Sequence, residues 1–457
     1  MKGRFRHHVL PLLTALAAWS GGAGAAPTIP ARPPSAVAAP AAQVTPSAAL
    51  TASSPAQQAF EEVAGRLQAD YAGLAAVDRA ALVQEYRDRL LAVCQGQGLR
   101  CPAETAYPVI EAQLTALGDP HTFLQWPDEY QDFVSSALGG QRLQFGFKLA
   151  ELDGERRLIT EVVPGSAADQ AGLRRGDVLR QLGGQAYRYS DLTDAREAGK
   201  PTTLVLERLG QRLSVQLTAA RTAAADPPRL SWVEAPATGQ GRTAVIRIPT
   251  FLSAGEVATR VHDQVRQARS GGAGGIVVDL RGNAGGSLLE CDLAASAFVP
   301  EFSRVAHSAG RTSVTRVAGG RRWDDGASVG RIASPQLWRG PLTVLVDEGS
   351  ASCAEFFAYE VQRSGAGTVV GVPTSGVGNT ATRVFPLTGG AALQMTVLHY
   401  SKPGGQAYPV QVRPDLSVQG GEAVLRALAQ GRDLTLEAGV QSLRRQSLAR
   451  RPWAKAE

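Results

Sequence analysis

The chain has 457 residues, of which 44% are hydrophobic. At about 150 residues per domain, this length predicts roughly three domains with sizeable cores, which excludes a wholly disordered or fibrous protein. The 47 basic residues exceed the 41 acidic ones, but they are spread along the chain. Because no stripe of Lys and Arg is interleaved with aromatic residues, nucleic acid is not the expected partner.

The N-terminal segment, residues 1–25, has the pattern of a secretory signal peptide. Three basic residues precede an apolar run over 9–19, and small residues end in Ala23-Gly24-Ala25, which is typical of a cleavage site. The apolar run is too short to span a bilayer as a permanent helix, so an uncleaved anchor is the weaker alternative. We therefore expect an exported protein, periplasmic, peripherally associated with the cell envelope, or secreted.

A linker and a helical segment are expected next. Residues 26–56 are almost all Ala, Pro, Ser, Thr and Val, which predicts an extended tether. Residues 57–138 are expected to be helical, because apolar residues recur there at three- and four-residue spacing. Helices are predicted from Gln57, over 80–93 and over 106–117. Cys94 and Cys101 bracket a polar loop and are candidates for a small disulfide in an oxidising compartment.

Two regions of different character follow. Residues 139–222 have short β-type runs separated by Gly turns, and residues 229–430 alternate strands with helices, which is typical of a layered α/β core. The strands are predicted at 144–149, 158–163, 178–182, 202–207, 212–217, 243–248, 275–280, 342–346 and 368–372. The helices are predicted at 255–270, from Ser287, from Ser352 and at 421–429. A basic helical tail, 431–457, ends the chain.

The segment 165–179, GSAADQAGLRRGDVL, combines a capped short helix, a Gly turn and a strand. It resembles a PDZ domain of the bacterial protease-associated type, which we assign to residues 139–222. In PDZ domains a peptide adds as a strand to a sheet edge, and backbone N–H groups hold its C-terminal carboxylate. The resemblance implies that Phe145, Gly146 and Phe147 form the carboxylate loop and that protein or peptide C-termini are the partners.

Two further segments each read as a strand, a sharp turn and a helix: GIVVDLRGNAGG at 275–286 and VLVDEGSASCAE at 344–355. Together with Asp119-Pro120-His121, they resemble the carboxyl-terminal processing (tail-specific) peptidases. The resemblance covers roughly 57–430. It implies an α+β or α/β multidomain protein with a helical segment, a PDZ domain and a layered protease core of the crotonase-like or ClpP-like type. With no C-x-x-C pair and no clustered His and Cys, no metal or cofactor is expected.

By match to the S-A-S-x-x-E pattern of that family, Ser352 is the implied nucleophile and Ser350 a cap or turn residue. A serine at a helix N-terminus lies where free N–H groups and the helix dipole stabilise negative charge. The N–H of Cys353, with one from Gly285 or Gly286, is the implied oxyanion hole. Cys353 and Cys291 are read as separate buried thiols, with a disulfide between them as the weaker alternative.

The chain departs from the family at the general base. The family's usual lysine lies 25 residues after the serine, in a segment that reads GVPTSGVG here at 371–378, and its position is Val377. Valine cannot accept a proton. The acidic residue that the family often carries eleven positions after the serine is Arg363. The usual Ser–Lys dyad is therefore absent.

Another group must activate Ser352, because an unassisted serine is a weak nucleophile near neutral pH. His121 is the favoured base, since histidine transfers protons at neutral pH and some relatives use a histidine that precedes the PDZ module. Lys402 is the weaker alternative, because the other lysines beyond the signal lie in the PDZ region or the tail.

Two functions from different classes remain. The first is an exported serine endopeptidase that binds protein C-termini and cleaves envelope or secreted proteins through an acyl-enzyme at Ser352. The second is an inactive pseudo-peptidase that acts as a peptide-binding adaptor, which Val377 and Arg363 favour. A third and weaker reading is an envelope scaffold whose basic tail binds acidic surfaces.

Overall fold

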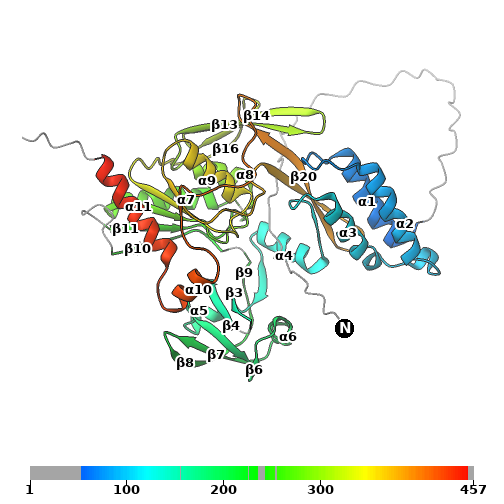
Figure 1. Ribbon diagram of the computed structural model, residues 1–457, viewed down its shortest axis with the longest axis horizontal. Coiled ribbons are helices and arrows are strands. Elements are labelled where there is room, and N and C mark those ends of the chain that lie inside the picture. Colours follow the sequence, from blue (N-terminus) through cyan, green and yellow to red (C-terminus); the bar gives the residue numbers. More distant parts are fainter. Residues whose placement is uncertain (1–52, 155, 225, 235–241, 253–254, 451–457) are drawn as a thin grey trace, which may run out of the picture.

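The computed structural model describes residues 53–154, 156–224, 226–234, 242–252 and 255–450 (Figure 1). The predicted signal peptide and nearly all of the predicted linker lie outside these residues. The described chain has a helical part, a β-rich part and a larger α/β core, as the sequence predicted. No helix in the described ranges combines the length and apolar character that crossing a membrane requires.

The helical part is built on three helices, α1 (Pro55–Ala69), α2 (Arg79–Val93) and α3 (Tyr107–Leu117). The first helix begins earlier than Gln57, because the Ser54 hydroxyl accepts the Gln57 N–H while the Gln57 side chain accepts the Ser54 N–H. Cys94 and Cys101 form a disulfide at the end of α2, which confirms the pairing considered from the sequence.

This helical part is joined to the core by a short strand. β1 (Phe123–Gln125) pairs antiparallel with β20 (Ala392–Ser401), and Leu393 and Met395 of β20 pack into the helical part's hydrophobic cluster. The turn that carries His121 lies directly before β1. Strand pairing therefore brings a residue from the N-terminal region against the core.

The β-rich part, for which the sequence predicted a PDZ domain and which we call the PDZ part, holds one sheet in the order β3-β4-β5-β7-β8, with β6 beside β5, and a separate pair of β2 and β9. Helix α4 (Pro127–Ala137), the last helix of the predicted helical segment, leads into this part. Its elements are β2 (Gln141–Gln144), β3 (Phe147–Asp153), β4 (Arg156–Val162), α5 (Ala167–Gln170), β5 (Val178–Leu182), β6 (Gln185–Ala186), α6 (Tyr189–Ala198), β7 (Thr202–Arg208), β8 (Gln211–Leu217) and β9 (Ala220–Ala223).

One predicted strand in this part is interrupted. Of the run 144–149, residue 144 ends β2 and 147–149 begin β3, and the chain bends between them because Gly146 has φ +88°. A Cβ added at Gly146 would lie 2.0 Å from the Cβ of Ser166, so only glycine fits this bend.

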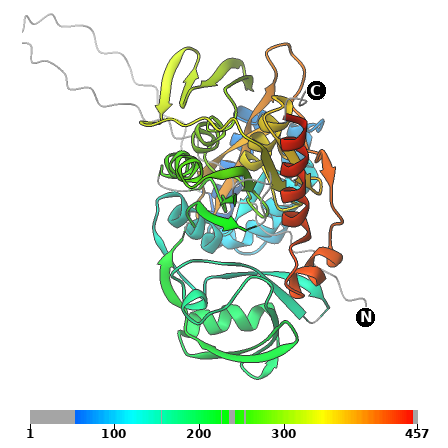
Figure 2. The same cartoon turned by 90° about the vertical axis from the view of Figure 1, so that its left-hand side faces the viewer.

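The core centres on a sheet in the order β10-β11-β12-β17-β18-β21, whose inner strands are parallel. Its strands are β10 (Arg229–Val233), β11 (Arg242–Arg247), β12 (Ala273–Asp279), β17 (Leu342–Val346), β18 (Thr368–Gly371) and β21 (Leu416–Ser417). Helices α7 (Val257–Ser270), α8 (Leu288–Ala295) and α9 (Cys353–Arg363) cover one face, and α11 (Leu434–Arg450) covers the other. Figure 2 shows α11 running along the core above the PDZ part.

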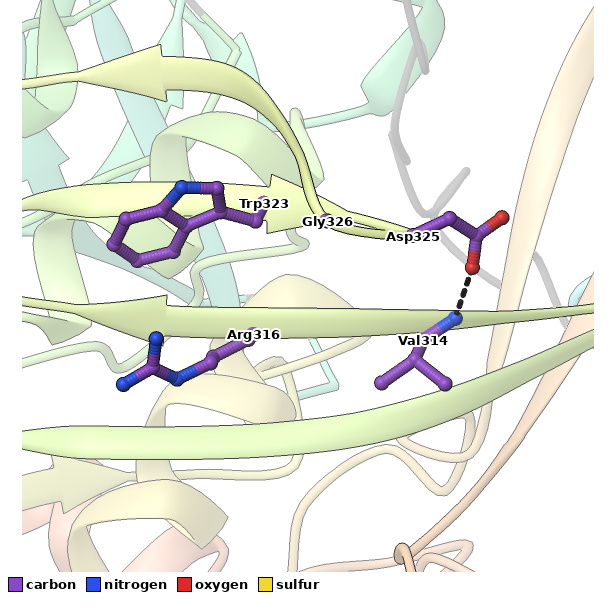
Figure 3. A pocket seen from close by; sticks show the side chains of 5 residues that line it. All are labelled: Val314, Arg316, Trp323, Asp325 and Gly326. Carbon is purple, nitrogen blue, oxygen red and sulfur yellow. Dashed lines mark hydrogen bonds between the residues drawn. The ribbon is translucent and has the colours of Figure 1, made fainter.

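A second sheet packs on the helices of the core, in the order β1-β20-β13-β14-β15-β16, with β19 beside β20. Its remaining strands are β13 (Glu301–Ser308), β14 (Arg311–Ala318), β15 (Arg321–Asp324), β16 (Ala327–Arg331) and β19 (Thr380–Pro386). None of these was predicted. Between β14 and β15 a shallow hollow is lined by Val314, Arg316, Trp323, Asp325 and Gly326 (Figure 3). Arg316 there lies over the Trp323 ring and pairs with Glu301, so the hollow carries no unpaired cation of its own.

The short helix α10 (Glu422–Ala429) connects the core to the PDZ part. Leu428 of α10 packs with Leu152, Leu158 and Val178 on the face of the PDZ sheet that points away from the PDZ core. The PDZ sheet is therefore held between its own core and the C-terminal segment.

Candidate active site

Two turns meet at the carboxyl edge of the parallel sheet, because β12 and β17 are neighbours whose register pairs Asp279 with Leu345. The Gly282 N–H donates to the Asp347 carboxylate (2.7 Å), and the Ala351 N–H donates to the Asn283 carbonyl (2.9 Å). The Gly-rich turn at 280–286 and the serine turn at 347–352 therefore form one rigid site.

Ser352 lies at the end of the second turn, immediately before α9 begins at Cys353. Its backbone has φ +52° and ψ −114°, in a region that costs a non-glycine residue about 1–3 kcal/mol. Such strain persists only where the surroundings enforce it, as at the strand-to-helix nucleophile turns of α/β hydrolases. Only 1% of the residue is exposed.

Glu355 holds the serine turn to the loop in which the family carries its lysine. Its buried carboxylate accepts the N–H of Ser352 (2.8 Å), Gly376 (2.9 Å) and Val377 (3.0 Å), and the hydroxyl of Thr374 (2.6 Å). Burial raises the Glu355 pKa to about 7, although these four donors oppose the shift. Because its lone pairs are taken up in this way, Glu355 is a structural link and not a free base.

The two glycines proposed for the oxyanion hole differ. The Gly285 N–H donates to Asn283 Oδ1 (2.8 Å), so that donor already has a partner. Gly286 has φ +143°, and a Cβ there would lie 2.2 Å from the Phe251 carbonyl carbon. The Cys353 thiol donates to the Gly286 carbonyl (3.1 Å), which ties this glycine to the first residue of α9. This geometry favours Gly286 over Gly285 as the partner of the Cys353 N–H.

His121 is buried, and its backbone N–H donates to Asp119 Oδ1 (3.0 Å). Its Nδ1 lies 2.7 Å from the Thr380 Oγ1, whereas its buried Nε2 has no hydrogen-bond partner among the described residues. Burial lowers the His121 pKa to about 4, with the Asp119 charge acting in the opposite direction. Thr380 also donates to the Val377 carbonyl (3.4 Å), so His121 and Glu355 contact the same loop.

Lys402 lies elsewhere on the core. Its Nζ donates to Gln406 (2.8 Å) and lies 5.4 Å from the centre of the Tyr359 ring. Tyr359 is seven residues beyond Ser352 on α9, which corresponds to about 10 Å along the helix. The geometry therefore gives the weaker candidate base no support.

The remaining sequence-predicted groups have ordinary partners. Arg363 pairs with Glu360 (2.6 Å). Cys291 and Cys353 are both buried free thiols, as the favoured interpretation expected, and burial raises the Cys291 pKa.

The segment predicted to form the carboxylate loop, 145–147, lies at the bend between β2 and β3. Phe145 is buried, and its ring stacks on Phe147 at 6.1 Å. The Phe145 and Gly146 carbonyls accept the N–H groups of Ala168 and Val163. In the described sheet β3 pairs only with β4, so its other edge is open, as strand addition by a peptide requires.

Thr374 and Thr380 were not singled out from the sequence. Thr380 meets His121 only because β1 and β19 both pair with β20, and no spacing or motif signals that meeting. Glu355 is the glutamate of the S-A-S-x-x-E pattern, but its hydrogen bonds to the loop at 374–377 could be recognised only from the fold.

These features define the class: an α/β core with a strained serine at a strand-to-helix turn, joined to a PDZ part. Residues 242–418 match Peptidase family S41, and residues 158–208 match the PDZ domain. The chain thus contains a peptidase family S41 domain and a PDZ domain, which confirms the resemblance to the carboxyl-terminal processing peptidases.

Curated relatives carry that name. Carboxyl-terminal-processing peptidase 3 of Arabidopsis thaliana, a chloroplast protein, is 26% identical over 335 residues, which cover 69% of this chain and 60% of the relative. The carboxyl-terminal-processing protease of Synechocystis is 29% identical over 351 residues, which cover 74% of this chain and 75% of the relative. A solved structure from Bacteroides fragilis, described as an S41 protease, shares the fold with a TM-score of 0.51 at 18% identity, over 74% of this chain and 88% of that one.

Proposed function

We propose that the protein is an exported serine endopeptidase that binds protein C-termini through its PDZ domain and cleaves envelope or secreted proteins. The observation that carries the proposal is the strained backbone of Ser352 at the N-terminus of α9. A purely structural turn has no need of a serine at φ +52°, where glycine would be unstrained. The S41 domain and its named relatives support the same class of reaction.

In the proposed reaction, the Ser352 Oγ forms a bond to the scissile carbonyl carbon while its proton passes to His121 Nε2. The carbonyl oxygen becomes an oxyanion next to the Cys353 and Gly286 N–H groups, which stabilise it. The C–N bond then breaks, and the leaving amine takes the proton from Nε2. Water next attacks the ester, gives one proton to Nε2, and releases the acid product as that proton returns to Ser352.

His121 Nε2 has no hydrogen-bond partner in the described chain, so Ser352 Oγ is not bonded to it in this structure and the two atoms must come together when substrate binds. The lowered pKa leaves the ring neutral at pH 7 and therefore able to accept the proton. A pKa of about 4 makes it a weaker base than an ordinary histidine, and general-base catalysis is most efficient when the pKa lies near the working pH. We therefore expect slow turnover.

The second candidate is a peptide-binding adaptor without catalysis. It is favoured by Val377 at the lysine position and by the low basicity of His121. The open edge of β3 serves peptide capture equally in both candidates.

The deciding experiment is cleavage of an unstructured protein, followed by intact mass, with Ser352→Ala, His121→Ala and Lys402→Ala beside the wild type. Loss of cleavage with the first two, but not the third, is the result we expect. Cleavage that survives His121→Ala would move the base elsewhere. No cleavage by a wild-type preparation that binds peptide would favour the adaptor.

Export is tested separately, by expressing the full chain in a Gram-negative host and sequencing the N-terminus of the periplasmic product. A mature chain beginning at Ala26 is expected. A cytoplasmic product that retains Met1 would contradict this part of the proposal.

A further inference from the structure

The His121 ring has one close side-chain neighbour at Nδ1, and it is a hydroxyl. In Ser-His-Asp triads a carboxylate holds that nitrogen and so fixes which tautomer the ring adopts. Here Thr380 Oγ1 lies 2.7 Å from Nδ1, and Asp119 is bound instead to the His121 backbone N–H and the Thr122 hydroxyl. The position of a triad carboxylate is thus occupied by a neutral group.

The burial of the ring decides where its proton lies. A neutral imidazole carries one N–H, on either Nδ1 or Nε2. On Nδ1 this N–H has the Thr380 oxygen as an acceptor, and the Thr380 hydroxyl can give its own hydrogen to the Val377 carbonyl (3.4 Å). With the proton on Nε2, that N–H would be a buried donor without an acceptor in the described chain, and the Thr380 hydroxyl would have to turn to the bare Nδ1 and give up the Val377 carbonyl. Because Nε2 is unpartnered in either case, the Nδ1–H tautomer is favoured by one additional hydrogen bond, about 0.5–1.5 kcal/mol.

We propose that Thr380 is a positioning residue that holds His121 as the Nδ1–H tautomer and leaves the Nε2 lone pair free to take the Ser352 proton. This inference rests on the proposed function for its catalytic meaning. The relay runs from the His121 Nδ1–H to Thr380 Oγ1 and from the Thr380 hydroxyl to the Val377 carbonyl. It ends at Val377, at the position where the family carries its lysine, so this loop helps to hold the proposed base.

The first test reads the tautomer directly and needs no activity. The chain is labelled with 15N-histidine, the ring nitrogens are observed by NMR, and His121→Ala assigns the signal. We expect a protonated Nδ1 and a bare Nε2 in the wild type. A His121 ring protonated at Nε2 would overturn the proposal, whether or not the protein cleaves peptides.

The second test uses a matched pair of variants. Thr380→Val keeps the shape of the side chain and removes the hydroxyl, whereas Thr380→Ser keeps the hydroxyl. In Thr380→Val we expect the Nε2–H tautomer to become populated and kcat to fall by about 100-fold with KM unchanged, near the lower end of what a positioned general base contributes. Thr380→Ser should restore both readouts to near the wild-type values.

The outcomes separate this inference from the function on which it rests. If the tautomer shifts in Thr380→Val but no variant or wild type cleaves, the positioning stands and the catalytic proposal fails. If Thr380→Val is folded, as circular dichroism would report, and keeps both the wild-type tautomer and the wild-type kcat, Thr380 does not position His121.

Discussion

Replacing Glu355 by glutamine should change how stability depends on pH. Burial raises the pKa of this carboxyl from 4.5 to about 7, so the folded protein keeps the proton over a range in which the unfolded chain has lost it. The protonated group therefore contributes stability that is full below about pH 4.5 and is lost as the pH rises to about 7. The shift corresponds to about 3 kcal/mol.

Glu355→Gln cannot titrate, so it should lack this decline. At about 2–4 °C per kcal/mol for a core of this size, the Tm of the wild type should fall relative to that of Glu355→Gln by about 5–12 °C between pH 5 and pH 8. The variant should also be less stable overall. Each Glu355 oxygen now accepts two hydrogen bonds, whereas glutamine replaces one oxygen with an NH2 group, which cannot accept and would face two donors.

Thermal melts across the pH range measure both effects, with Glu85→Gln on the exposed surface of α2 as the control. Because other groups titrate alike in the three proteins, the difference between curves isolates Glu355. Parallel curves of Tm against pH for the wild type and Glu355→Gln would refute the reasoning. They would mean that Glu355 has the same pKa in the folded and unfolded protein.

Ser352→Gly should be more stable than Ser352→Ala by about 1–3 kcal/mol, because glycine adopts φ +52° without strain; equal urea midpoints would argue against a strained turn. Cleavage should persist down to about pH 5 and fall only as the pH approaches 4, because the lowered pKa keeps His121 unprotonated; a half-maximal rate near pH 6.5 would contradict its burial or its role. Replacing Cys94 and Cys101 by serine should lower stability by about 2.5 kcal/mol, the loop-closure value for about eight residues, and a Tm equal to that of the wild type would rule out the bridge in solution. Peptides with an apolar free C-terminus should bind the PDZ domain and lose affinity on amidation, and calorimetry that gives equal affinities would exclude carboxylate capture.

Local pattern determined the strand-turn-helix segments of the core. The predicted strands at 342–346 and 178–182 have the bounds of β17 and β5, because a short apolar run between turn residues leaves few alternatives. The same reasoning located Ser352 at a helix N-terminus and Cys94 within reach of Cys101. By contrast, β13 to β16 went unpredicted. Strands β14 to β16 have few buried positions and therefore a weak apolar pattern. Strand β13 does bury alternate residues, but one of them is Arg304, whose charge interrupts the apolar pattern in the sequence.

The environment of the candidate base was decided by tertiary structure alone. The sequence offered His121 and Lys402 as alternatives, and it is the pairing of β1 and β19 with β20 that buries His121 against Thr380. Likewise, the sequence gives no reason to prefer Gly285 or Gly286 as the oxyanion-hole donor. The fold distinguishes them, because the Asn283 side chain accepts the N–H of Gly285. Residue types and spacing determine which groups a chain can offer to a reaction. Protonation states and partners depend on burial and hydrogen bonding between segments far apart in sequence, which local pattern does not encode.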